Sequence, residues 1–152
     1  MACGNWRHMA THISHSPADT QALGQQWGSE ARPGLVIGLS GDLGAGKTQL
    51  VKGLALGLGI ASRVTSPTFA LVNVYTDGAL ILNHLDLYRL DSPQLIESAG
   101  LEDYLHPEGV SVIEWAERWF KGAAEFAGRY RAVTIEAVSE TERRITYEDF
   151  GD

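Results

Sequence analysis

Short apolar runs alternate along the chain with segments in which apolar residues recur every three or four positions. The strand-like runs are 35–40, 70–75, 79–86, 110–113, 131–138 and 144–150. The helix-like segments are 19–30, 50–58 and 93–99, and a further helix is expected from Ala116. Runs 35–40 and 110–113 are almost wholly apolar, which is typical of strands buried on both faces of a parallel sheet. The pattern therefore predicts an α/β fold.

Turn residues separate these segments. Thr76-Asp77-Gly78 contains the Asp-Gly turn signal, so the runs on either side of it are expected to form an antiparallel hairpin. Ser92-Pro93 is a typical helix start, with serine as the N-cap and proline at the first position. Gly100 ends that helix, and Pro33-Gly34 closes the first one.

Length and composition indicate one compact domain. The chain has 152 residues, 44% of them hydrophobic, which is enough for a core. Its first sixteen residues do not resemble a core element, so we expect a flexible tail at 1–16 and a single domain at 17–152. His8, His12 and His15 would share one face of a helix, a spacing that metal sites use, but a flexible tail is the preferred interpretation.

The charge balance restricts the possible partners. The net charge is −7, and affinity for phosphate backbones comes mainly from clustered Lys and Arg. We therefore expect contact with RNA only through a partner, and no DNA partner. Apolar stretches long enough for a membrane span and a signal-peptide pattern are both missing, so a cytoplasmic protein without a membrane partner is expected. Cys3 is the lone cysteine, which excludes an intramolecular disulfide.

A glycine-rich loop carries the chemistry. The segment Gly41-Asp42-Leu43-Gly44-Ala45-Gly46-Lys47-Thr48 matches the P-loop pattern in full, between a buried strand and a helix. Such a loop turns its backbone N–H groups toward phosphate oxygens, and the helix start adds the positive end of its dipole. We expect Lys47 to reach the β- and γ-phosphates and Thr48 to give its hydroxyl to Mg²⁺. The loop predicts binding of ATP or GTP.

Two carboxylates are candidates for holding Mg²⁺ or orienting water. Asp86 and Glu114 each close a strand-like run, at the sheet edge where α/β folds gather ligands. Spacing alone does not decide which of them is the metal ligand. Between the loop helix and the hairpin lie Ser66, Pro67 and Thr68, where phosphate-binding hydrolases often sense the γ-phosphate with a hydroxyl. A plain proline turn is the equal alternative for that segment.

Taken together, these residues resemble the bacterial TsaE (YjeE) family. The shared motifs are G-D-L-G-A-G-K-T at 41–48, S-P-T-F at 66–69, H-L-D-L-Y-R-L at 84–90 and I-E-W at 113–115. The resemblance spans about residues 18–145. It implies a P-loop NTPase fold with a central, mostly parallel sheet edged by antiparallel strands. It also implies ATP and Mg²⁺ as ligands and slow ATP hydrolysis by a Mg²⁺-dependent ATPase.

The resemblance further implies two partners, TsaB and TsaD. TsaD would transfer the threonylcarbamoyl group to adenosine 37 of tRNAs that read ANN codons, and ATP hydrolysis by this chain would reset the complex between turnovers. By the same resemblance Lys47, Asp86 and Glu114 are catalytic, with Asp86 as the Walker-B-like aspartate and Glu114 as a Mg²⁺ ligand. Trp115 would lie beside the nucleotide, and Thr20 near the adenine.

One position departs from the family pattern, and the match of one family arginine is not decided by the sequence. Ala116 stands where the family often has proline, which favours a helix there. An arginine near the C-terminus contacts nucleotide in some members, and either Arg143 or Arg144 fits that place.

Three other functions are alternatives for a chain with a P-loop. A small-molecule kinase would need a lid with several arginines, and the segment between the loop helix and Glu114 holds only Arg63 and Arg89. Arg89 is the candidate for an arginine finger within the chain. A GTPase would need Asn-Lys-x-Asp, to which the segment 83–86 is only an early and imperfect match. A regulatory protein that binds ATP without needing to hydrolyse it is the third alternative.

Overall fold

The computed structural model describes residues 8–42, 44–67, 69–119 and 128–151. Seven strands of this part form one sheet in the order β1-β7-β6-β2-β5-β4-β3. The strands are β1 His8–Ser14, β2 Val36–Ser40, β3 Val72–Tyr75, β4 Leu82–Asp86, β5 Val110–Glu114, β6 Tyr130–Ala137 and β7 Arg143–Phe150. The helices are α1 Pro17–Glu30, α2 Lys47–Gly57 and α3 Pro93–Ser98, with single 3₁₀ turns at η1 Glu102–Leu105 and η2 Ala116–Arg118.

The sheet has a parallel centre and antiparallel edges, as the sequence predicted. Strands β6, β2, β5 and β4 are parallel to one another, whereas the pairs β1–β7 and β7–β6 at one edge and β3–β4 at the other are antiparallel. The carboxyl ends of β2, β5 and β4 therefore meet at one edge. Ligands of open α/β sheets bind at this edge, and the glycine loop starts there.

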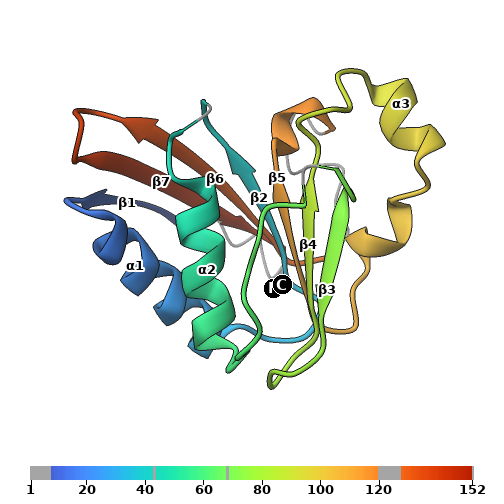
Figure 1. The fold of residues 1–152 in the computed structure, drawn as a ribbon, viewed down its shortest axis with the longest axis horizontal. Coiled ribbons are helices and arrows are strands. Elements are labelled where there is room, and N and C mark those ends of the chain that lie inside the picture. Colours follow the sequence, from blue (N-terminus) through green and yellow to red (C-terminus); the bar gives the residue numbers. More distant parts are fainter. Residues whose placement is uncertain (1–7, 43, 68, 120–127, 152) are drawn as a thin grey trace, which may run out of the picture.

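Helices α1 and α2 lie side by side on one face of the sheet (Figure 1). The two helix backbones approach closely because glycines face each other. A Cβ on Gly24 of α1 would lie 2.3 Å from the carbonyl oxygen of Leu50, and a Cβ on Gly53 of α2 would lie 2.1 Å from that of Gln21. This contact fixes α2, and thus the glycine loop before it, against the rest of the fold.

We expect Gly53→Ala to lower the free energy of unfolding by about 3 kcal/mol, the upper end of the range for overpacked cores. The added Cβ meets backbone, which cannot rotate away as a side chain would. Urea denaturation measures the effect. The control is Gly128→Ala, an exposed position where a Cβ meets nothing within 4 Å. Equal urea midpoints for the two variants would contradict the close packing of α1 on α2.

The prediction of a flexible tail at 1–16 is wrong for residues 8–14. These residues form β1, which pairs along its whole length with β7. The strand was missed because its side chains carry little apolar alternation, and the backbone ladder to β7 holds it instead. His8 and His12 lie on this strand and His15 follows it, so the three histidines do not share a helix face. Among the described residues, no group of three or more His, Cys, Asp or Glu side chains is placed to hold a metal ion. Residues 1–7 lie outside the described part.

The predictions for one turn and one helix also change. The hairpin β3–β4 forms, but Tyr75 pairs with Leu82, so its connection is longer than an Asp-Gly turn. Asp77 instead accepts hydrogen bonds at 3.0 Å from the backbone N–H groups of Ala61 and Ser62, which ties the hairpin to the segment after α2. The helix expected from Ala116 is only the 3₁₀ turn η2 in the described residues, and 120–127 lie outside them.

Candidate functional site

One pocket of about 470 Å³ opens where the glycine loop meets the ends of β4 and β5. The predicted site residues that line it are Thr20, Gly44, Gly46, Lys47, Thr48, Ser66, Asp86, Glu114, Trp115 and Arg143. The pocket lining does not include the loop residues Gly41, Asp42 and Ala45. It also does not include Pro67 of the switch-like segment. Leu43 and Thr68 lie outside the described residues. The structure thus brings most of the predicted residues to one place.

The loop conformation depends on glycine. Gly44 and Gly46 have φ values of 80° and 106°, in the left-handed region that other residues rarely adopt. Gly46 is the N-cap of α2 and offers no side chain to the helix start. The first N–H groups of α2 are therefore available to an anion in the pocket, together with the positive end of the helix dipole.

Lys47 lies at the floor of the pocket and is only 5% exposed. Its ammonium donates hydrogen bonds to the carbonyl oxygens of Gly41 at 2.5 Å and Asp42 at 2.9 Å. The same Nζ lies 4.1 Å from the ring centroid of Trp115. Burial lowers the pKa of Lys47 from its ordinary value, and nearby carboxylates, Glu114 foremost, oppose that shift. Phosphate charge in the pocket would oppose it further.

Glu114 faces the loop threonine. The Thr48 hydroxyl donates to Glu114 Oε1 at 3.4 Å, and Glu114 is 3% exposed. On the other side, His84 Nε2 lies 2.5 Å from Glu114 Oε2. The carboxylate is therefore fixed from two directions, with one oxygen toward the loop and the other toward β4.

Asp86 has a different set of contacts. It pairs with Glu114 in the register of β4 and β5, so the two carboxylates lie side by side on the same sheet face. Ser66 Oγ donates to Asp86 Oδ2 at 2.9 Å, and the N–H of Tyr88 donates to Asp86 Oδ1 at 2.9 Å. The structure thus separates the two candidates: Glu114 contacts the loop, and Asp86 contacts the segment that the sequence identified as switch-like.

Trp115 has an unusual backbone. Its φ of 63° and ψ of 39° lie in the left-handed region, which is rare for a bulky residue. The ring lies 5.2 Å from the ring of Tyr88 and 5.1 Å from the guanidinium of Arg118. This conformation ends β5 sharply and turns the indole over Lys47. Strained residues of this kind gather at functional sites.

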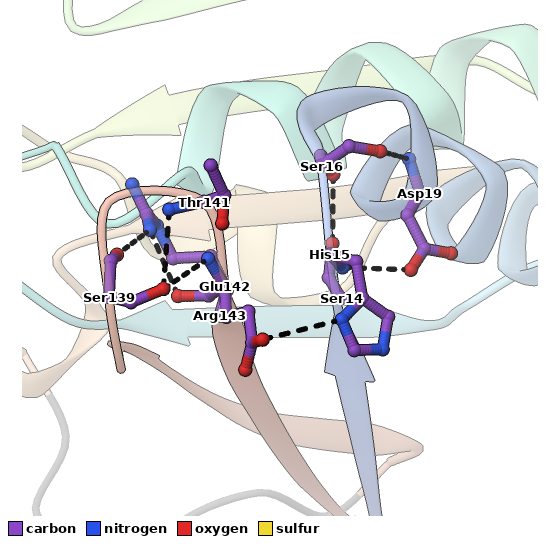
Figure 2. Close-up of polar contacts among 8 residues, drawn as sticks. All are labelled: Ser14, His15, Ser16, Asp19, Ser139, Thr141, Glu142 and Arg143. Atoms are coloured by element: carbon purple, nitrogen blue, oxygen red, sulfur yellow. Dashed lines mark hydrogen bonds and ion pairs between the residues drawn. The ribbon is translucent and has the colours of Figure 1, made fainter.

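Two turns form the outer wall of the pocket. One joins β1 to α1 and contributes Ser16 to the lining. Beside it, Thr20 of α1 is buried, and its hydroxyl lies 2.7 Å from Ser14 Oγ. The other joins β6 to β7. Figure 2 shows the two turns side by side, with His15 Nδ1 3.7 Å from Glu142 Oε1 between them.

The two arginines of β7 differ in position. Arg143 donates from Nε to the carbonyl oxygen of Ala45 at 3.0 Å and from Nη1 to that of Ser139 at 2.8 Å, so it joins the glycine loop to the β6–β7 turn. Arg144 pairs with Glu136 on the neighbouring strand at 3.2 Å and does not line the pocket. Of the two candidates, the structure places only Arg143 at the site.

Comparison with known proteins places the chain in a family. The family model described as "Threonylcarbamoyl adenosine biosynthesis protein TsaE" matches residues 14–145. The chain belongs to the TsaE family. A Bacillus subtilis protein called "tRNA threonylcarbamoyladenosine biosynthesis protein TsaE" is 39% identical over 137 residues, 90% of this chain and 84% of that protein. A Treponema pallidum protein of the same name is 42% identical over 134 residues, 88% and 96% of the two chains.

The fold agrees with that assignment. The crystal structure of Bacillus subtilis YdiB superposes with a TM-score of 0.77 at 34% identity, covering 96% of this chain and 88% of that one. The TsaE family is named for biosynthesis of threonylcarbamoyladenosine, and the names of both relatives place that nucleoside in tRNA. In the part of the chain that the structure describes, every helix is too short or too polar to cross a membrane.

Sequence reasoning missed several residues of this TsaE site. His84, Tyr88 and Arg118 received no role from the motifs. His84 contacts Glu114, the Tyr88 ring packs against the ring of Trp115, and Arg118 lies over both of those rings. For His84 a signal was available. It precedes Asp86 by two residues on a strand, and alternate residues of a strand share a face.

Proposed function

We propose that the chain is a P-loop ATPase that supports threonylcarbamoyl modification of tRNA adenosine, hydrolysing ATP in complex with TsaB and TsaD. The observation that carries this proposal is the meeting of Lys47, Thr48 and Glu114 in one pocket at the start of α2. A buried ammonium, a hydroxyl and a carboxylate at a helix N-terminus form a site for phosphate and a divalent cation. Membership of the TsaE family supports the choice of pathway.

The donor set fits Mg²⁺. Thr48 Oγ1 and Glu114 Oε1 are hard oxygen ligands 3.4 Å apart at the pocket wall. Mg²⁺ in phosphate sites binds one or two carboxylates and substrate oxygens and keeps several waters, so it needs no cage of three acidic side chains. In this proposal Thr48 and Glu114 would hold the ion, which would supply charge neutralisation to the bound phosphates.

The residues of the chain have distinct tasks in the proposed hydrolysis to ADP and phosphate. Lys47 exchanges the loop carbonyls for γ-phosphate oxygens, which are stronger acceptors. The loop N–H groups and Lys47 stabilise charge that develops on the phosphoryl group. Asp86, held beside Glu114, orients the attacking water, and Ser66 links that carboxylate to the switch-like segment.

Slow hydrolysis by the isolated chain is part of the proposal. Arg143 is the lone arginine among the described residues that line the pocket, and its guanidinium donates to backbone carbonyls. Arg89 stacks on the ring of Phe69 instead, 4.3 Å from its centroid. An arginine finger supplied by a partner contributes about 10³- to 10⁵-fold in related systems. The acidic net charge of the chain supports contact with tRNA through partners. In this proposal the complex works in the cytoplasm.

The rival functions find less support. The segment 83–86, which resembles a guanine-reading motif, lies inside β4, where Asn83 is buried and donates to Ser111. Neither Arg63 nor Arg89 lines the pocket, as a kinase lid would require. The test is phosphate release with ATP and GTP, together with a search for phosphorylated nucleosides and nucleotides. ATP-dependent release without a phosphorylated acceptor is expected. Tighter GTP binding, or a phosphorylated acceptor, would overturn the proposal.

We expect Arg143→Ala to weaken ATP binding about tenfold, because a hydrogen bond from a charged group contributes about 1.5–3 kcal/mol. Without the guanidinium, the carbonyl oxygens of Ala45 and Ser139 lose their shared donor and the loop is less well held. The matched control is Arg144→Ala, the next residue of β7, whose partner Glu136 is exposed. Calorimetry measures both affinities. An equal loss in the two variants would count against a role of Arg143 in the loop.

A further inference from the structure

His84 is a buried histidine with one nitrogen in use. Its side chain is fully buried in the strand β4. Nε2 lies 2.5 Å from Glu114 Oε2, and Nδ1 has no hydrogen-bond partner among the described residues. A position that only fills the core would be expected to hold an apolar residue, or a histidine with hydrogen-bond partners for both ring nitrogens. Here the single contact is to the carboxylate that faces the P-loop.

The place of His84 in the sheet explains that contact. Strand alternation puts Leu82, His84 and Asp86 on one face of β4, and the register puts Val112 and Glu114 beside them on β5. Leu82 and Val112 belong to the core under α1 and α2. His84 is thus the first polar side chain between that core and the pocket, directly behind Glu114.

The contact determines the tautomer. Nε2 and a carboxylate oxygen are both acceptors unless a proton lies between them, and the Thr48 hydroxyl already donates to the other oxygen of the carboxylate. In the neutral imidazole, Nε2 therefore carries the hydrogen and donates to the carboxylate. Nδ1 is then a bare lone pair, and an unsatisfied acceptor is more often tolerated in a protein interior than an unsatisfied N–H.

We propose that His84 is a positioning residue that turns Glu114 Oε1 toward Thr48 by holding Glu114 Oε2. This rests on the proposed function in one respect, the Mg²⁺ that Thr48 and Glu114 would bind. Lys47 Nζ lies 4.1 Å from the ring centroid of Trp115, the residue after Glu114, so a Glu114 carboxylate without His84 would have a cation nearby as a competing partner. With His84 in place, Lys47 stays on the carbonyls of Gly41 and Asp42, available to phosphate.

Three variants test the proposal through metal affinity. His84→Leu fills the space but cannot donate, whereas His84→Gln offers an amide N–H near the place of Nε2. Asn83→Leu is the control: it also removes a buried polar contact between β4 and β5, to Ser111, on the opposite sheet face. The measurement is Mn²⁺ binding in the presence of ADP, followed by water-proton relaxation, beside ADP affinity in metal-free buffer.

His84→Leu should weaken Mn²⁺ binding about 10- to 100-fold, the usual effect of losing a group that orients a metal ligand, and leave metal-free ADP binding unchanged. His84→Gln should restore most of the affinity, and Asn83→Leu should bind Mn²⁺ like the wild type. Wild-type affinity in folded His84→Leu would overturn the proposal, and so would an equal loss in Asn83→Leu.

A second measurement does not depend on nucleotide or metal. Long-range ¹⁵N–¹H correlation spectra of the free wild-type protein distinguish the two neutral tautomers of His84. The proposal requires the hydrogen on Nε2, with a resonance that shifts in Glu114→Gln. A hydrogen on Nδ1 would overturn it. If the wild type binds no ADP, the proposed function fails, while these spectra still decide whether His84 holds Glu114.

Discussion

Replacing Lys47 by alanine is expected to lower the rate of ATP hydrolysis about 10²- to 10³-fold, the usual effect of losing one preorganised donor to transition-state charge. Lys47 is the buried cation of the pocket floor, held by the carbonyl oxygens of Gly41 and Asp42 and by the ring of Trp115. In the proposed function, its ammonium contacts the γ-phosphate of a bound nucleotide.

The control for Lys47→Ala is Lys52→Ala. Both lysines belong to α2, but Lys52 does not line the pocket. We expect Lys52→Ala to hydrolyse ATP at the wild-type rate. Lys47→Ala should keep the wild-type free energy of unfolding to within about 1 kcal/mol, since the Lys47 ammonium is buried at a cost. Equal hydrolysis by the wild type and Lys47→Ala would place the chemistry outside the P-loop.

Replacing Glu114 by glutamine should lower hydrolysis by at least about 100-fold, while leaving nucleotide binding in metal-free buffer unchanged or tighter. The reason is a separation of two effects. The carboxylate oxygen toward Thr48 is the proposed Mg²⁺ ligand, so its loss removes the metal-dependent part of binding. The same carboxylate repels phosphate, so its loss does not weaken the metal-free part.

Two further variants distinguish Glu114 from its neighbours. Asp86→Asn should reduce hydrolysis but keep the Mg²⁺ dependence of nucleotide binding, because Asp86 is held by Ser66 and Tyr88 instead of facing Thr48. Glu136→Gln, at an exposed position of β6, should change neither. If Asp86→Asn lost the Mg²⁺ dependence and Glu114→Gln kept it, the assignment of the two carboxylates would be reversed.

The sequence predicted the parts of the fold that strong local signals specify. The apolar strand before the glycine loop and the Ser92 cap are both present. The parallel centre with antiparallel edges, which the family resemblance implied, is present as well. The strand β1 was missed because an edge strand can be held by backbone hydrogen bonds to β7 without an apolar side-chain pattern. The Asp-Gly turn was misread because Asp77 caps a neighbouring segment, a contact that local sequence cannot show.

For the candidate site, too, local sequence motifs predicted some features, whereas others depend on contacts that form only in the folded chain. Motifs named the residues of the glycine-rich loop, since the P-loop pattern needs glycine, lysine and threonine at fixed spacing. They could not assign the two strand-end carboxylates, because that depends on which one the register of β4 and β5 and the side-chain contacts turn toward Thr48. Nor could motifs choose between Arg143 and Arg144. The two are adjacent on β7, but Arg143 contacts the glycine loop and Arg144 contacts Glu136.

The most direct test of the central claim is reconstitution of tRNA modification. The chain is added to purified TsaB and TsaD with ATP, Mg²⁺, the threonylcarbamoyl donor and unmodified tRNA, and the number of modified tRNA molecules per complex is counted over time. We predict that the wild type supports many turnovers, and that Lys47→Ala and Glu114→Gln support at most one. Wild-type turnover with both variants would contradict a role for hydrolysis, and no stimulation by the wild type would contradict the proposed function itself.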